Sequence, residues 1–214
     1  MRAGLSEREA LAGEGVIGRE EVVREVTGLL AQGRSVLLVG PPDCGKTALV
    51  EAVTRPGVLV VDPMERVSRP RAAALRRALD RGTVCLAAAR TLERAQLGCV
   101  GRVLWRLTVV RVRPLGPAAM RAIIEGELRR GGVPPEAIVS RWIRKAVRVA
   151  AGRPGWGVGL AERAAARWRE SRTIPPPGLA LVEVLQEDAL VGLRQEEGSQ
   201  AARRSCRHRR GPEP

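Results

Sequence analysis

Residues 40–47 read Gly-Pro-Pro-Asp-Cys-Gly-Lys-Thr and match the phosphate-binding loop pattern G-x-x-x-x-G-K-[ST]. An apolar run at residues 35–39 precedes the loop, and a helical pattern follows it. Gly40 and Gly45 allow the backbone to curl, so that successive N–H groups point at a phosphate. The sequence therefore predicts a strand, a loop and a helix that bind a nucleotide. The alternative is a glycine-rich turn without a ligand.

The two last positions of this loop have specific expected roles. Lys46 is expected to reach the β- and γ-phosphates, and the Thr47 hydroxyl to complete a magnesium site. The N-terminus of the helix that starts near Lys46 adds partial positive charge. Lysine occurs at positions 46 and 145 of a chain that otherwise uses arginine, so it stands where a compact charge is needed. The predicted phosphate-binding residues are Gly40, Pro41, Pro42, Asp43, Cys44, Gly45, Lys46, Thr47 and Ala48.

Strand and helix patterns alternate through the first half of the chain, which predicts a parallel sheet with right-handed crossovers. The run from Val58 to Val61 is apolar at every position, so we expect a strand that is buried on both faces. The predicted strands are 35–39, 58–62, 83–89 and 107–112, and the predicted helices between them are 18–33, 46–54, 68–82 and 91–103.

Strand patterns stop at residue 114, and helical patterns follow. The predicted helices are 117–130, 135–151 and 157–171. Their apolar stripes are Met120/Ile123/Ile124/Leu128, Ile138/Trp142/Ala146/Val149 and Leu160/Ala164/Trp168.

The fold class expected is α/β, with a parallel-sheet P-loop core followed by a small all-α helical lid. We interpret the four tryptophans as packing residues. The predicted parts are a flexible N-terminus (1–15), the core (16–113), the lid (114–172), a linker with a C-terminal helix (173–193) and a basic disordered tail (194–214).

Two acidic residues are candidates for metal binding and catalysis. Asp62 ends the apolar run and suits a magnesium ion held through water; the alternative is an ordinary aspartate that begins a turn. Pro63 stands where a glutamate that orients the attacking water is common, and the nearest glutamate is Glu65. A turn at Pro63 would bring Glu65 back toward the strand end, whereas a solvated glutamate before a helix is the equal alternative.

Composition limits the other function classes. The four cysteines show no C-x-x-C spacing and His208 is the one histidine, so neither a zinc site nor a disulfide framework is predicted. Cys44 inside the loop and the lack of a membrane-length apolar run favour a cytoplasmic protein without a membrane partner. The net charge of +14 is compatible with a nucleic-acid partner and equally with an arginine-rich coding bias. The Arg203–Arg210 cluster has the same two interpretations.

The segment Ile17-Gly-Arg-Glu-Glu21, the loop at 40–47, Asp62, a strand that ends at Ala89 and the helices after residue 114 together resemble AAA+ ATPases. The resemblance is closer to the branch that contains archaeal-type, origin-recognition-like and STAND-like ATPases. Two features depart from that family. The segment from Thr47 to Asp62 is too short for the usual intervening strand, so the sheet is reduced, and the Asp-Glu pair is missing.

The resemblance implies roles for further residues. Ile17 and Gly18 would line the adenine pocket, and Arg90 or Thr91 would sense the γ-phosphate. Arg153 or Pro154 would supply the lid motif that meets the nucleotide. Arg102 or Arg106 would act as an arginine finger in a neighbouring subunit. The catalytic set expected is Lys46, Asp62, Glu65 and Arg90.

The function expected from the loop and the resemblance is ATP binding with Mg²⁺, followed by hydrolysis that drives or gates assembly on a partner, with DNA as one candidate. A homo-oligomer is expected. One alternative is a nucleotide-gated binding module with negligible hydrolysis, and another is a small P-loop kinase. A GTPase is disfavoured because the chain has no N-K-x-D motif.

Overall fold

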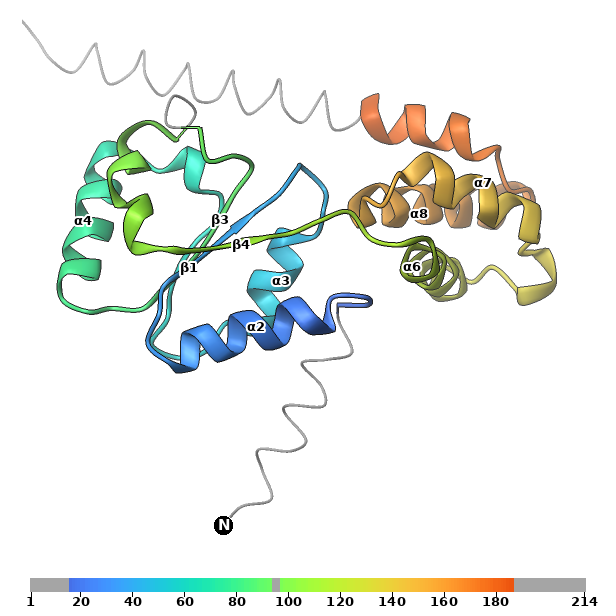
Figure 1. Cartoon of the computed structure of the whole chain (residues 1–214). Helices are drawn as coiled ribbons and strands as arrows, with labels where there is room; N and C mark the ends of the chain where they lie inside the picture. Colours follow the sequence, from blue (N-terminus) through green and yellow to red (C-terminus); the bar gives the residue numbers. More distant parts are fainter. Residues whose placement is uncertain (1–15, 94–96, 187–214) are drawn as a thin grey trace, which may run out of the picture.

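The computed structural model describes residues 16–93 and 97–186 (Figure 1). Four parallel strands of this part form one sheet in the order β2-β3-β1-β4. The predicted parallel α/β fold is therefore confirmed. The strands are β1 (Val36–Val39), β2 (Leu59–Val61), β3 (Cys85–Ala89) and β4 (Thr108–Arg111).

Helices cover both faces of the sheet (Figure 1). α2 (Glu20–Ala31) and α3 (Lys46–Val53) pack on one face, where Val36 and Leu38 of β1 meet them. The other face carries η1 (Met64–Arg66), α4 (Arg69–Asp80) and the 3-10 helix η2 (Gly98–Arg106), which pack on Leu37. Because successive strand residues point to opposite faces, β1 contributes to both cores.

The prediction that the strand at 58–62 is buried on both faces is wrong. β2 is an edge strand, and Leu59 and Val60 are 36% and 40% exposed to solvent. An apolar run shows that a strand can be buried, but whether it is buried depends on whether other strands lie on both sides of it. The short connection from Val53 to Leu59 carries no further strand, so the sheet ends at β2.

Three predicted helices differ in their limits. Residues 91–93 are not helical, residues 94–96 lie outside the described part, and η2 follows as 3-10 helix. The segment 135–151 divides into η3 (Pro135–Ala137) and α7 (Ser140–Ala150). The last helix, α8 (Pro154–Ser171), begins three residues early, because proline is tolerated in the first helical turn.

Helices α6 (Pro117–Arg130), α7 and α8 form a separate core beyond the carboxyl end of β4 (Figure 1). Met120, Ile124 and Leu128 of α6 are fully buried there, as the predicted stripe requires. In α7 the buried side chains are Ile143, Ala146 and Ala150, so the predicted stripe missed Ile143 and Ala150. A domain boundary near residue 114 stays a prediction.

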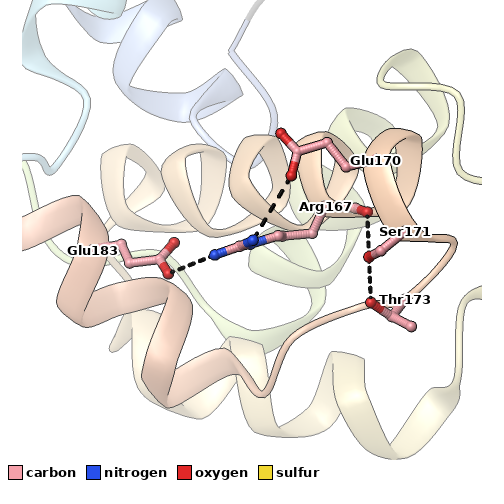
Figure 2. Close-up of polar contacts among 5 residues, drawn as sticks. All are labelled: Arg167, Glu170, Ser171, Thr173 and Glu183. Atoms are coloured by element: carbon pink, nitrogen blue, oxygen red, sulfur yellow. Dashed lines mark hydrogen bonds and ion pairs between the residues drawn. The ribbon is translucent and has the colours of Figure 1, made fainter.

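A further helical segment, residues 177–186, lies beside α8. Figure 2 shows how polar groups join the two: Arg167 contacts Glu170 of its own helix and Glu183 of the segment, both at 3.7 Å. The Ser171 hydroxyl donates to the Arg167 carbonyl and lies next to the Thr173 hydroxyl. Exposed ion pairs of this kind contribute little, so apolar contacts such as those of buried Ala180 hold the segment.

The tryptophans divide into two groups. Trp142, Trp156 and Trp168 are half-buried against the helical core, as predicted. Trp105 is 76% exposed, so its interpretation as a packing residue is wrong. It belongs to η2, which turns this side chain away from the sheet. No helix of the described part is long and apolar enough to cross a membrane. The predicted N-terminus, tail and Arg203–Arg210 cluster lie outside the described residues.

Candidate nucleotide-binding site

The loop between β1 and α3 is a tight curl with two residues in the left-handed region. Asp43 has φ 59° and Gly45 has φ 88°. Gly40 is needed for space, since a Cβ there would lie 2.5 Å from the Val112 carbonyl oxygen. The loop therefore depends on both glycines of the motif, each for a different reason.

Lys46 opens α3 and folds back over the loop. Its ammonium Nζ donates to the carbonyl oxygens of Gly40 at 2.9 Å and Pro41 at 2.8 Å. The backbone N–H groups of residues 44–47 have no acceptor among the described residues. Free N–H groups, a helix N-terminus and an ammonium together suit a phosphate, so the residues present fit a nucleotide.

Thr47 and Asp62 meet across the carboxyl edge of the sheet. The Thr47 hydroxyl donates to a carboxylate oxygen of Asp62 at 2.8 Å. The two residues come from α3 and from the end of β2, and parallel strands bring such ends to one edge. A hydroxyl beside a carboxylate is an oxygen donor set that Mg²⁺ accepts, with waters completing its octahedron. The predicted metal residues thus lie together and fit the ion.

Glu65 belongs to η1, and its carboxylate lies at the carboxyl end of β3, the neighbour of β2. The Asp62–Pro63 peptide bond is cis, and η1 follows it. One carboxylate oxygen of Glu65 accepts a hydrogen bond from the backbone N–H of Arg90, whereas the other is buried without a partner in the described part. The structure thus joins the predicted Glu65 and Arg90 through a backbone contact.

The start of α8 closes over the loop. The Gly155 N–H donates to the Asp43 carbonyl oxygen at 3.1 Å, and a Cβ at Gly45 would lie 3.2 Å from Pro154. A cleft of about 560 Å³ lies between this turn and the start of α3, with Lys46 and Thr47 in its wall. Of the two lid candidates Pro154 lines this cleft. Arg153 instead stacks over the Trp156 ring at 4.2 Å.

Arg19 is a residue that the sequence analysis did not assign. Its side chain is 6% exposed, and Nη2 donates to the Cys44 carbonyl oxygen at 3.0 Å, directly under the loop. Burial lowers the pKa of the guanidinium, and the nearby Cys44 opposes that shift. The Nε atom has no partner among the described residues. The one hint in the sequence was its position inside the segment 17–21, on which the family resemblance partly rests.

Gly18, one of the two predicted adenine-side residues, lies against α6. A Cβ at Gly18, which has φ 73°, would be 2.6 Å from the Ala119 side chain, so only glycine permits this approach. Ile17 remains 41% exposed. The segment before α2 therefore packs on α6 through Gly18.

The remaining candidate arginines differ in their surroundings. Arg90 and Arg102 are exposed. Arg106 forms an ion pair with Asp80 and stacks over the Trp105 ring at 4.8 Å. Since Arg106 already has a carboxylate partner, Arg102 is the freer of the two finger candidates.

Sequence comparison gives no relative: neither the protein-family models nor the curated proteins contain a match. Solved structures do match. The chain is similar to S. cerevisiae Hsp104 in its casein complex, with a TM-score of 0.57 and 19% identity. That match covers 77% of this chain and 40% of the Hsp104 chain, so this chain spans well under half of the Hsp104 length.

Two shorter proteins match as well. A Walker-type ATPase of Pyrococcus abyssi has a TM-score of 0.56 and 14% identity over 91% of this chain and 78% of its own. The RuvB Holliday junction branch migration motor of Thermotoga maritima has a TM-score of 0.52 and 14% identity over 79% of this chain and 69% of its own. These likenesses and the observed sheet agree, and the chain has the parallel α/β P-loop fold that these proteins share.

Proposed function

We propose that the chain binds ATP with Mg²⁺ in the cleft between the loop at 40–47 and the start of α8, and hydrolyses it. The observation that supports this proposal most strongly is the 2.8 Å hydrogen bond from the Thr47 hydroxyl to the Asp62 carboxylate, beside the Lys46 ammonium. A phosphate-binding cation and a metal-binding pair of this kind suit a nucleoside triphosphate better than a single phosphate. Adenine would lie toward Ile17 and Gly18.

Each residue has a role in the proposed reaction. Lys46 exchanges its two carbonyl partners for phosphate oxygens, and the N–H groups of residues 44–47 hold the β-phosphate. Mg²⁺ would neutralise charge that develops on the phosphates, with Thr47 as ligand and Asp62 holding it through water. Glu65 orients the attacking water, for which its carboxylate must leave the Arg90 N–H. Arg90 stabilises the γ-phosphate.

ATP binding is tested with Lys46→Ala, measured by calorimetry with Mg-ATP. We expect at least a tenfold loss of affinity, since a charge-assisted contact of Lys with phosphate contributes about 1.5–3 kcal/mol. The matched control is Lys145→Ala, which removes the other lysine from an exposed position on α7. Equal affinity in Lys46→Ala and the parent would contradict the proposal.

Hydrolysis is tested by phosphate release from Mg-ATP with and without duplex DNA, at two salt concentrations. Turnover that rises with DNA and declines with salt supports an ATPase coupled to nucleic acid. A turnover rate that is the same with and without DNA supports an ATPase with another partner. Glu65→Gln is expected to abolish turnover and to leave ATP binding unchanged. Glu25→Gln, at an exposed position of α2, is the control and should change neither.

A homo-oligomer is part of the proposal, with Arg102 of one copy reaching the nucleotide of its neighbour. Arg102→Ala is expected to lower turnover by about a thousandfold with ATP binding kept, since a finger acts on transition-state charge. Mixing this variant with Lys46→Ala should restore some turnover, because each supplies the part that the other lacks. Unchanged turnover in Arg102→Ala would rule out this residue as the finger.

A second candidate function is a nucleotide-gated binding module with negligible hydrolysis. The contact of Glu65 with the Arg90 N–H favours it, because the carboxylate is then engaged away from water. Slow ATP dissociation without phosphate release, in the presence and absence of DNA, would distinguish the module from the enzyme.

A further inference from the structure

The edge of the sheet at β2 is open. Leu59 donates its N–H to the Val84 carbonyl oxygen at 2.9 Å, which places that group on the β3 side. Since backbone polar groups alternate in direction along a strand, the N–H and C=O of Val60 point away from β3. No strand of the described part pairs with them. An extended chain would find unpaired donors and acceptors here.

A groove runs along this edge. It encloses about 660 Å³ between β2 and α4. Ala74, Leu75 and Ala78 of α4 line it together with Leu59 and Val60 of β2, so the walls are apolar and the two alanines leave room for larger side chains of a partner. A strand has side chains alternating at about 6–7 Å, and such a groove suits every second residue of it.

The rim of the groove is positively charged. Arg66, Arg71 and Arg81 line it, are exposed and have no ion pair within the described part of the chain. Two carboxylates close to the groove are engaged elsewhere, Asp62 with Thr47 and Asp80 with Arg106. The groove therefore complements an acidic ligand.

We propose that β2 is a docking site for an extended acidic peptide of a partner protein, which adds as a fifth strand and sets apolar residues into the groove. Charge argues against a second copy of this chain, because pairing two β2 edges would bring two sets of three arginines together. The backbone supplies the affinity and the arginines select acidic flanks. The groove adjoins the proposed ATP site at Asp62, whereas Arg66, Arg71 and Arg81 line the groove and do not line the ATP cleft.

The test uses the full chain and a fluorescent nine-residue probe that alternates Val or Thr with Glu, followed by anisotropy. We expect binding in the range of about 10–100 μM, typical of a small strand-pairing contact. Arg71→Glu combined with Arg81→Glu should weaken it at least about tenfold. The control is Arg141→Glu combined with Arg169→Glu, two exposed arginines of the lid with the same change of net charge.

A second probe carries N-methyl groups on the backbone nitrogens that would pair with β2. Loss of its binding supports strand addition, whereas binding equal to that of the parent probe overturns it. The proposal is also overturned if a probe with Lys in place of Glu binds equally well, or if the acidic probe does not bind at about millimolar concentration. Concentration-dependent dimers that Leu59→Glu abolishes would assign the edge to a second copy instead. ATP affinity is measured throughout and is expected to stay unchanged.

Discussion

β1 and β2 are both short apolar strands that lead into a loop of the candidate site, yet their surroundings differ. β1 lies between β3 and β4, and its Val36, Leu37 and Leu38 have 0% exposure. β2 has a neighbour on one side, and Leu59 keeps 36% exposure. Composition is nearly the same in the two strands, so their burial is decided by their position in the sheet. Interior strands hold the fold, and edge strands are available for contacts.

The largest effect is expected from shortening a buried side chain of β1. Leu37→Ala should lower the free energy of unfolding by about 2–5 kcal/mol, because it leaves a cavity between the sheet and α4. Leu59→Ala makes the same chemical change in β2 and should cost about 1 kcal/mol or less. Urea denaturation measures both. Equal losses would mean that β2 is covered in solution.

Two glycines, one at the start of the loop after β1 and one just before β2, offer a second comparison. Gly40→Ala places a Cβ 2.5 Å from the Val112 carbonyl oxygen, so β4 or the loop must move, at a cost of about 1–3 kcal/mol. Gly57→Ala, before β2, meets no atom within 4 Å and is strained by its φ of 86° alone, about 1–2 kcal/mol. ATP affinity separates them: we expect it to fall in Gly40→Ala and to persist in Gly57→Ala. Persistence in both would show that the loop tolerates the shift.

Cys85 of β3 pairs with Leu59 of β2, and it is buried in the core between the sheet and α4. Burial raises the pKa of its thiol from 9.0 to about 12. The unfolded thiol therefore loses its proton first, and this contribution to stability declines as pH rises from about 9 toward 12, by up to about 1.4 kcal/mol per pH unit.

Urea denaturation between pH 8 and pH 10.5 (roughly the range where the thiol titrates when unfolded) measures this decline. Cys85→Ala should remove it, whereas Cys99→Ala, at an exposed position, should not. An identical pH dependence in Cys85→Ala and the parent would mean that this thiol is accessible to water in the folded protein.

The sequence predicted most of the fold because strand and loop patterns are local. The G-x-x-x-x-G-K-[ST] spacing specifies the loop, and each apolar run became a strand. The edge position of β2 was not predictable from its own residues, since it depends on which strands pair. Likewise, Trp105 was interpreted as a packing residue near the sheet edge, between the predicted helix at 91–103 and the predicted strand at 107–112. In the structure η2 extends through this position and the side chain is exposed.

The site was predictable where one segment carries it and less so where segments meet. The pattern of residues 40–47 predicted Lys46 and Thr47, and the run before Asp62 predicted the carboxylate that lies beside Thr47; their roles toward a nucleotide and a metal stay predictions. Arg19 was missed because its partner, the Cys44 carbonyl, is a backbone group without a signature in the sequence. The ion pair of Arg106 with Asp80 joins η2 to α4, and it was not predictable because only the fold brings these two segments together.

The smallest perturbation is hydrogen exchange of the unaltered protein. β1 forms backbone hydrogen bonds with β3 on one side and β4 on the other, so we expect all amides of Val36–Val39 to exchange slowly. In β2 the amide of Leu59 should be protected by the Val84 carbonyl, and the amide of Val60 should exchange at nearly the rate of an open chain. Slow exchange at Val60 would mean that another segment already pairs with this edge, which would remove both the contrast between the strands and the proposed docking site. Fast exchange that slows when the acidic probe is added would locate the new strand at β2.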